Sequence, residues 1–207
     1  MKIDSQEQED REISLGPGLG NISSSKLEGL VSFHGYLATG AFVGIQMWAL
    51  GRRLLGLKDD ERVHVVCETL NCLPDPFQYL AGCTVGNKGL TIKDTGKMTV
   101  TITKHTPLDK EAPGVRIVLD PNKTKNYPKL HAWYMKTKKV EHGEAIDTLI
   151  EVGEDVYSYK HVSVPIRSRP EKTITICTSC GESFIRNKTN SNYCPDCLKM
   201  ENLLSDL

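Results

Sequence analysis

Residues 67–84 read Cys67-Glu-Thr-Leu-Asn-Cys72-Leu-Pro-Asp75-Pro-Phe-Gln78-Tyr-Leu-Ala-Gly82-Cys83-Thr84. This stretch holds three of the seven cysteines and lies between a β-rich run and a glycine-containing turn. The intervals between its cysteines, five and then eleven residues, match no standard metal knuckle. The residues alone leave two interpretations open. The stretch is either part of a functional site or a core segment with three inert thiols, because free cysteine often packs as a small hydrophobe.

The segments around this stretch predict an α+β domain. Upstream, helical spacing of apolar residues predicts a helix over 39–57, and a valine-rich strand over 62–67 leads into the stretch. Residues 74–82 can form a short helix. Strands are expected at 89–93, 97–103, 115–119 and 156–164, the first two as a hairpin, with helices at 127–138 and 141–152. Because helices and strands do not alternate strictly along the chain, the order favours a mainly antiparallel sheet packed with helices over a doubly wound sheet.

Composition divides the chain into four parts. Residues 1–25 are charged and then rich in glycine and serine, which predicts a flexible arm with little core. The α+β domain is expected over 26–164, a proline-bounded linker over 165–171 and a small domain over 172–207. Domains most often have about 100–150 residues, so a chain of 207 suits this plan.

The C-terminal part contains a specific metal motif. Cys177-Thr-Ser-Cys180 and Cys194-Pro-Asp-Cys197 are separated by thirteen residues. Two Cys-x-x-Cys pairs at this distance fill the tetrahedral shell of Zn²⁺. With all four positions taken by sulfur, the predicted zinc is structural, and the flanking pattern of strand, knuckle and helix indicates a treble-clef-like zinc finger.

Charge and hydropathy disfavour some partners. Lys+Arg and Asp+Glu each number 26, and residues 171–207 carry four basic and five acidic side chains, so nucleic-acid binding is an unfavoured alternative. The longest apolar stretch, residues 41–50, is shorter than the about 20 residues that a membrane helix needs. No membrane association is expected. The absence of a signal-peptide pattern, together with reduced thiols, predicts a cytoplasmic protein.

A weaker set of candidates lies in the first domain. His34 stands at a turn before the long helix, where an imidazole can act as ligand or base, although a lone histidine is more often simply hydrogen bonded. The thiols of Cys67, Cys72 and Cys83 have the same ambiguity. Spacing leaves a metal or redox site here as an open alternative.

Several separated motifs resemble the E-subunit family of formylmethanofuran dehydrogenases. They are Phe33-His34-Gly35-Tyr36-Leu37-Ala38-Thr39-Gly40, Cys72-Leu-Pro-Asp75-Pro-Phe-Gln78, Gly82-Cys83-Thr84 and Lys93-Asp94-Thr-Gly96-Lys97. The resemblance implies an α+β fold, a homodimer and association with molybdenum or tungsten formylmethanofuran dehydrogenase subunits of one-carbon, methanogenesis-related metabolism, or with another protein. It also implies metal ligands near the first helix.

The chain departs from the family pattern His-Gly-His-x-Cys-Pro-Gly. Tyr36, Ala38 and Thr39 stand where the second histidine, the cysteine and the proline would be, and Leu70 replaces an expected acid. Alanine and leucine cannot bind a metal, so a second metal would depend on His34, on Cys72 and on a group from outside the chain, with Cys67 or Cys83 as an optional further ligand. Without a metal, a degenerate cleft would bind its ligand through His34, Tyr36, Asp75, Asp94 and Lys97, or only the fold is retained.

Two main functions follow. The first is a binding or accessory protein with a structural four-cysteine zinc site, whose intrinsic catalysis is doubtful. The second is an enzyme or redox accessory subunit of one-carbon metabolism that uses His34, Cys72 and Cys83 at an open metal or nucleophilic site. A nucleic-acid-binding zinc finger is the third alternative.

Overall fold

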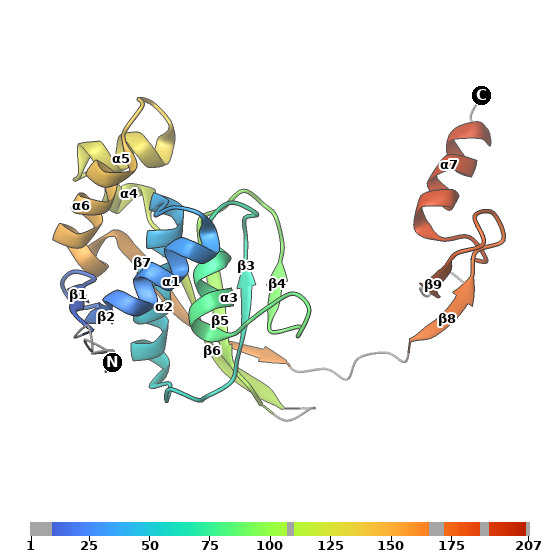
Figure 1. The fold of residues 1–207 in the computed structure, drawn as a ribbon, viewed down its shortest axis with the longest axis horizontal. Coiled ribbons are helices and arrows are strands. Elements are labelled where there is room, and N and C mark those ends of the chain that lie inside the picture. Colours follow the sequence, from blue (N-terminus) through green and yellow to red (C-terminus); the bar gives the residue numbers. More distant parts are fainter. Residues whose placement is uncertain (1–9, 107–109, 166–171, 187–190, 206–207) are drawn as a thin grey trace, which may run out of the picture. The chain divides into compact units, whose positions relative to one another are not determined.

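The computed structural model describes residues 10–106, 110–165, 172–186 and 191–205 (Figure 1). The chain divides into two compact units, residues 1–166 and 167–207. The first unit contains the elements β1 (Glu12–Ser14), β2 (Asn21–Ser23), α1 (Ser24–His34), α2 (Thr39–Leu55), β3 (Val63–Cys67), α3 (Asp75–Ala81), β4 (Leu90–Ile92), β5 (Thr99–Lys104), β6 (Glu111–Leu119), α4 (Pro121–Thr124), α5 (Pro128–Met135), α6 (His142–Val152), the 3₁₀ helix η1 (Gly153–Val156) and β7 (Tyr157–Pro165). The expected α+β class is confirmed.

The five-stranded sheet has the order β4-β3-β5-β6-β7 and is mainly antiparallel. Among the described strands, β3 and β4 alone pair in parallel, and the crossover between them, residues 68–89, contains α3 and most of the stretch 67–84. The expected hairpin of residues 89–93 and 97–103 is wrong, because β3 lies between β4 and β5. The connecting loop passes over the end of β3: the N–H of Lys93 donates to Cys67 O at 2.8 Å, and the N–H groups of Thr95 and Lys97 each donate to Glu68 O at 3.0 Å.

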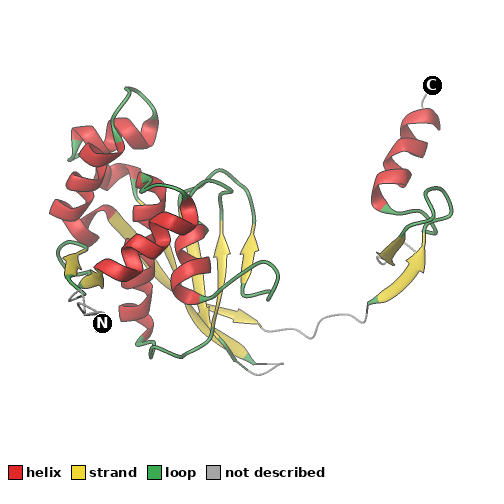
Figure 2. Ribbon diagram, in the orientation of Figure 1, coloured by secondary structure: helices red, strands yellow, loops and turns green. Residues whose placement is uncertain are grey.

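Helix α2 is the central element of the helical layer, which Figure 2 shows gathered on one side of the sheet. It packs on β5 and β6 and also contacts α3 and α6. Its first nine residues are all buried, so this helix is apolar on several faces and not only on one stripe. The core between α2 and the sheet includes Phe42, Ile45, Leu50, Val65, Ile102 and Ile117.

The N-terminal segment differs from the expected arm. Residues 1–9 lie outside the described part of the chain, but β1 and β2 pair in antiparallel orientation, and the side chains of Leu15, Leu19 and Ile22 are buried. The turn of this hairpin lies against the end of α6, where the N–H of Glu154 donates to Pro17 O at 3.0 Å. A glycine-rich composition thus reflects positive φ angles in a tight, docked turn and not mobility.

A buried glutamine connects three of these elements. Gln46 of α2 is fully buried, and its Nε2 donates to Leu15 O at 2.7 Å and to Leu149 O at 2.8 Å. Its Oε1 accepts the hydroxyl proton of Tyr157 at 2.6 Å. The side chain therefore joins α2 to the N-terminal hairpin, α6 and β7.

The second unit is small, and the part of it that the structure describes has little hydrophobic core. It consists of the antiparallel pair β8 (Thr173–Ile176) and β9 (Ser183–Arg186), followed by α7 (Pro195–Ser205). Ile174 and Ile176 are 71% and 66% exposed, whereas Cys177 is buried. The expected linker lies outside the described residues except for Pro165, the last residue of β7.

Among the described residues, no helix combines the length and apolar character that crossing a membrane requires.

Candidate functional site

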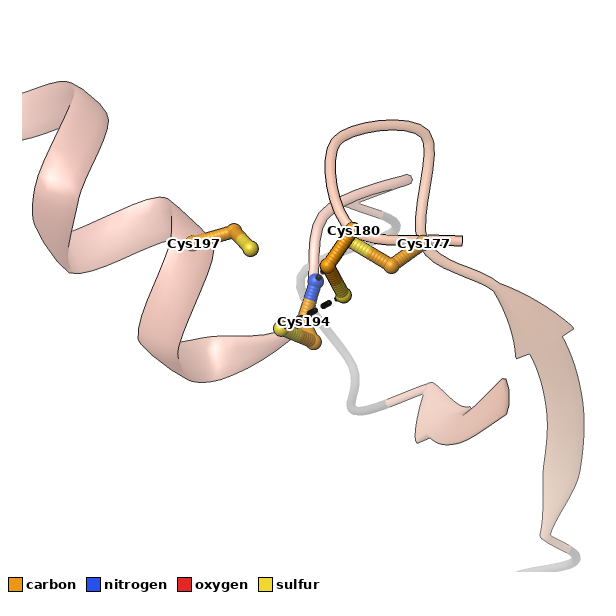
Figure 3. A group of neighbouring side chains, drawn as sticks. All are labelled: Cys177, Cys180, Cys194 and Cys197. Atoms are coloured by element: carbon orange, nitrogen blue, oxygen red, sulfur yellow. Dashed lines mark hydrogen bonds between the residues drawn. The ribbon is translucent and has the colours of Figure 1, made fainter. Parts of the chain in front are cut away.

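Four cysteine sulfurs converge in the second unit. The sulfurs of Cys177, Cys180, Cys194 and Cys197 all lie within 4.8 Å of one another (Figure 3). Cys177 and Cys180 stand on the turn between β8 and β9, Cys194 immediately precedes α7, and Cys197 lies in its first turn. The arrangement brings together all four predicted metal ligands and can hold a metal ion.

The electrostatics of this group fit a cation. The backbone N–H groups of Cys180 and then Cys194 lower the pKa of Cys177 to about 6, the latter donating to Cys177 Sγ at 3.3 Å. Hydrogen bonding with the Cys194 side chain, the largest cause, raises the pKa of Cys197 to about 12. Close thiolates repel one another, so ionising one disfavours the next; a divalent cation among them removes this conflict.

A second group of side chains lies in the first unit, where α1 ends. His34 Nδ1 and Asp75 Oδ2 are 2.6 Å apart, and Gln78 Nε2 donates to Asp75 Oδ1 at 3.1 Å. Because a carboxylate accepts, Nδ1 of His34 carries the proton of this contact, so the neutral tautomer that it favours has its lone pair at Nε2. A carboxylate that fixes the tautomer in this way is the usual second partner of a histidine that binds a metal or accepts a proton.

Two aromatic contacts extend this group to α6. The Tyr36 ring lies 5.3 Å from the His34 ring and 5.5 Å from the His142 ring, between centroids, and is 53% exposed. His142 Nδ1 accepts the N–H of Thr39 at 3.1 Å and lies 2.8 Å from its hydroxyl. The N-cap residue of α2, Ala38, has no capping side chain, so His142 caps this helix from α6.

Cys72 lies beside the start of α2. A Cβ built on Gly40 would lie 3.3 Å from Cys72 Cβ, so glycine permits this approach. Burial and then the charge of Asp75 raise the pKa of the Cys72 thiol. Cys72 is therefore near Asp75 but is mostly protonated at neutral pH.

The other two cysteines of residues 67–84 lie in the core. Cys67 and Cys83 are 0% and 3% exposed, and burial raises their pKa values to about 12 and about 11. The Cys83 thiol donates to the carbonyls of Val63 and Ala81 at 3.4 and 3.5 Å. Buried thiols with raised pKa values react poorly, so Cys67 and Cys83 match the interpretation as inert core residues. They are not part of the His34 group.

Asp94 and Lys97 belong to the loop over the end of β3. Asp94 Oδ1 accepts the N–H of Leu70 at 3.4 Å, and Lys97 Nζ lies 4.0 Å from Glu68 Oε2. Glu68 also accepts from Arg116 Nε and Nη2, at 3.0 and 2.8 Å. These contacts organise the loop around Glu68. Across the described residues, a set of three or more converging metal-ligand atoms is found only at the four C-terminal cysteines.

Sequence reasoning missed His142, which follows His34 by more than a hundred residues. Its position at the start of a helix gives no indication that it lies beside Tyr36 and Thr39. The packing of α6 against α2 brings these residues together.

Comparisons with known proteins agree with the fold of the first unit. The family model described as "FmdE, Molybdenum formylmethanofuran dehydrogenase operon" matches residues 33–164, a range that contains the His34 group but not the four C-terminal cysteines. The crystal structure of a "tungsten formylmethanofuran dehydrogenase subunit e (fmde)-like protein" from Syntrophus aciditrophicus is similar, with a TM-score of 0.69 and 28% identity, covering 86% of this chain and 92% of that one.

A curated relative has a different description. A "Probable S-adenosyl-L-methionine-binding protein" of Archaeoglobus fulgidus is 25% identical over 187 residues, which cover 80% of this chain and 50% of the relative. The chain thus spans about half the length of that protein.

Proposed function

Because this chain belongs to the FmdE family, we propose that it is a zinc-stabilised binding protein whose first unit holds a ligand at the His34 group. In this proposal the C-terminal unit carries a structural zinc and makes contacts with a second copy or with another protein. The observation that carries the zinc assignment is the convergence of four cysteine sulfurs within 4.8 Å.

Zinc is the metal that this donor set fits best. Four thiolates complete a tetrahedral shell and leave no position for water or substrate, so the ion would stabilise structure and not catalyse. Among the residues of the second unit whose burial is described, few apolar side chains are buried, and Ile174, Ile176 and Ile185 are exposed. In zinc-finger peptides, zinc binding contributes about 10–16 kcal/mol, enough to fold a unit with so small a core.

Metal analysis of the purified protein tests the zinc assignment. We expect one zinc per chain, its loss in Cys180→Ser, and its retention in the matched variant Cys72→Ser. Chelation should collapse the NMR signals of residues 173–186 and 191–205. The fluorescence of Trp48 and Trp133 should stay unchanged, since both tryptophans lie in the first unit. Unchanged C-terminal signals after complete zinc removal would overturn the proposal.

The His34–Asp75 contact supports ligand binding in the first unit. In the neutral tautomer, Nε2 of His34 offers a hydrogen-bond acceptor. The exposed ring of Tyr36 offers a π surface, and the carboxylate of Asp75 offers a negative charge. S-adenosyl-L-methionine carries sulfonium and ammonium cations, which these groups would attract. It is the first ligand to test, given the description of the Archaeoglobus relative.

Titration calorimetry with S-adenosyl-L-methionine tests this ligand. We expect binding that weakens about tenfold in Asp75→Asn, which removes the negative charge, and in Tyr36→Leu, which removes the ring. Tyr159→Leu is the control, because Tyr159 is similarly exposed but lies on β7. Absence of binding, or equal weakening in the control, would exclude this ligand.

A second candidate function is acid–base chemistry or metal ligation at His34 in an enzyme or redox subunit of one-carbon metabolism. The oriented Nδ1–H of His34 favours it, because this contact fixes the tautomer that exposes Nε2. A second bound metal that is lost in both His34→Gln and Cys72→Ser would favour this candidate over simple ligand binding. The mass of the protein in solution, with and without formylmethanofuran dehydrogenase subunits, tests the proposed homodimer and partner.

A further inference from the structure

One segment of the first unit is strongly basic although the whole chain has zero net charge. Residues 121–140 contain six lysines and no acidic residue. This segment forms α4, α5 and the connection to α6. It ends two residues before His142, which contacts Tyr36 of the His34 group, and it produces a local positive potential that the neutral overall charge conceals.

A hollow of 470 Å³ lies within this segment. Its lining includes the side chains Lys125, Lys129, His131, Thr137, Lys138 and Lys139. Ligand sites for small molecules usually have volumes of about 300–1,000 Å³. The hollow thus has the size of a small-molecule site, and its lining sets four lysines against one acidic residue, Glu144.

The lysines of the hollow are held only weakly by acidic neighbours. Lys129 Nζ lies 2.8 Å from Glu144 Oε1, and Lys139 Nζ lies 3.1 Å from Glu141 Oε1. All four side chains are about half exposed or more, so these ion pairs contribute little and an incoming anion can replace them. Lys138 has no acidic partner among the described residues, and Lys125 Nζ donates to the neutral Asn122 Oδ1 at 3.2 Å.

Helix α6 begins at the same hollow. Val140 and Glu144, on either side of its first residues, contribute to the lining. Its N-cap residue, Glu141, makes no side-chain capping bond. The N-terminal end of a helix carries partial positive charge, which adds to that of the lysines.

We propose that this hollow binds a small anion with two or more negative charges, of the class of pyrophosphates or polycarboxylates. The volume favours a small ligand over a polymer. Acidic residues flank the lysine segment in the sequence, Asp120 before it and Glu141 after it, and four of its six lysines line this hollow.

Binding of inorganic pyrophosphate, tripolyphosphate and citrate to the full chain tests the proposal, measured by calorimetry at two salt concentrations. We expect at least one of these anions to bind. Preference for pyrophosphate or tripolyphosphate would indicate a phosphate ligand, and preference for citrate would indicate a polycarboxylate ligand. The double variant Lys125→Gln/Lys138→Gln should bind about tenfold more weakly, the size expected for two exposed charge contacts. The control Lys26→Gln/Lys160→Gln makes the same charge change at exposed residues of α1 and β7 and should bind as the wild type does.

Three results would overturn the proposal. The first is no binding by any of the three anions, and the second is equal weakening in the two double variants, which would indicate unspecific attraction. The third is single-stranded RNA that binds more tightly than every small anion and is lost in Lys125→Gln/Lys138→Gln. That result would assign the surface to nucleic acid. Circular dichroism of both variants verifies that the fold is unchanged.

Discussion

The buried side chain of Gln46 provides the most direct test of the fold. In Gln46→Leu, Leu149 O keeps the N–H of Gly153 as a donor. The cost therefore falls mainly on Leu15 O and on the Tyr157 hydroxyl, which lose the partners described above. A buried polar group without a partner costs about 1–3 kcal/mol, so the two together predict a loss of about 2–6 kcal/mol in the free energy of unfolding.

A double-mutant cycle separates this network from simple packing. Tyr157→Phe alone leaves Gln46 Oε1 without its donor and should cost about 1–3 kcal/mol. In the double variant the stranded hydroxyl is absent, so the two losses should not add, and we expect a coupling energy of about 2 kcal/mol. The control Tyr159→Phe, on the same strand but half exposed, should change stability by less than about 0.5 kcal/mol.

Urea unfolding followed by tryptophan fluorescence measures these values. Both tryptophans lie in the first unit, so the signal reports that unit and not the C-terminal one. Additive losses for Gln46→Leu and Tyr157→Phe, or a loss below about 1 kcal/mol for Gln46→Leu, would refute the inferred network.

Three further predictions follow from local geometry. Asp120→Ala should destabilise the protein by about 1 kcal/mol at pH 7, since this carboxylate caps α4. Hydrogen bonds from the Ser158 hydroxyl and then from the Asn122 N–H lower the pKa of the Asp120 carboxyl below 3.8 in the folded protein. The carboxylate therefore stabilises the fold fully above pH 3.8 and loses this effect as the pH falls through the folded-state pKa. The difference between wild type and variant in urea unfolding should shrink over the same pH range. Gly153→Ala should lower the free energy of unfolding by more than about 2 kcal/mol in the same assay, because φ is +55° and the new Cβ would clash with the carbonyl oxygen of Pro17. The control Gly143→Ala should be tolerated, because open space surrounds that position. Iodoacetamide at pH 8 should modify Cys72 before the two core thiols, as peptide mass spectrometry can show, and faster labelling of the core thiols would contradict their burial.

Local patterns predicted most elements of the fold. Helical periodicity placed α2, α5 and α6, and the alternation of residues 97–103 placed β5, because these periods reflect which side chains face the core. The pairing of the strands was predicted incorrectly at one point. A short turn such as Asp94-Thr-Gly96 favours a hairpin, but the loop instead donates its N–H groups to the end of β3, which separates β4 from β5.

The N-terminal hairpin shows a second limit. Its glycines predicted an arm, since sequence alone does not distinguish a flexible glycine from one that a docked turn requires. The docking partner, the end of α6, lies more than a hundred residues away in the chain.

The sequence by itself determined the α+β class, the family and the four C-terminal cysteines, because the spacing within each Cys-x-x-Cys pair is local. Only the tertiary structure decided the environment of residues 67–84. It placed Cys67 and Cys83 in the core, brought Asp75 to His34, and added His142 from α6. Those contacts join residues far apart in the chain, and packing of the helices on the sheet, not spacing in the sequence, sets their distances.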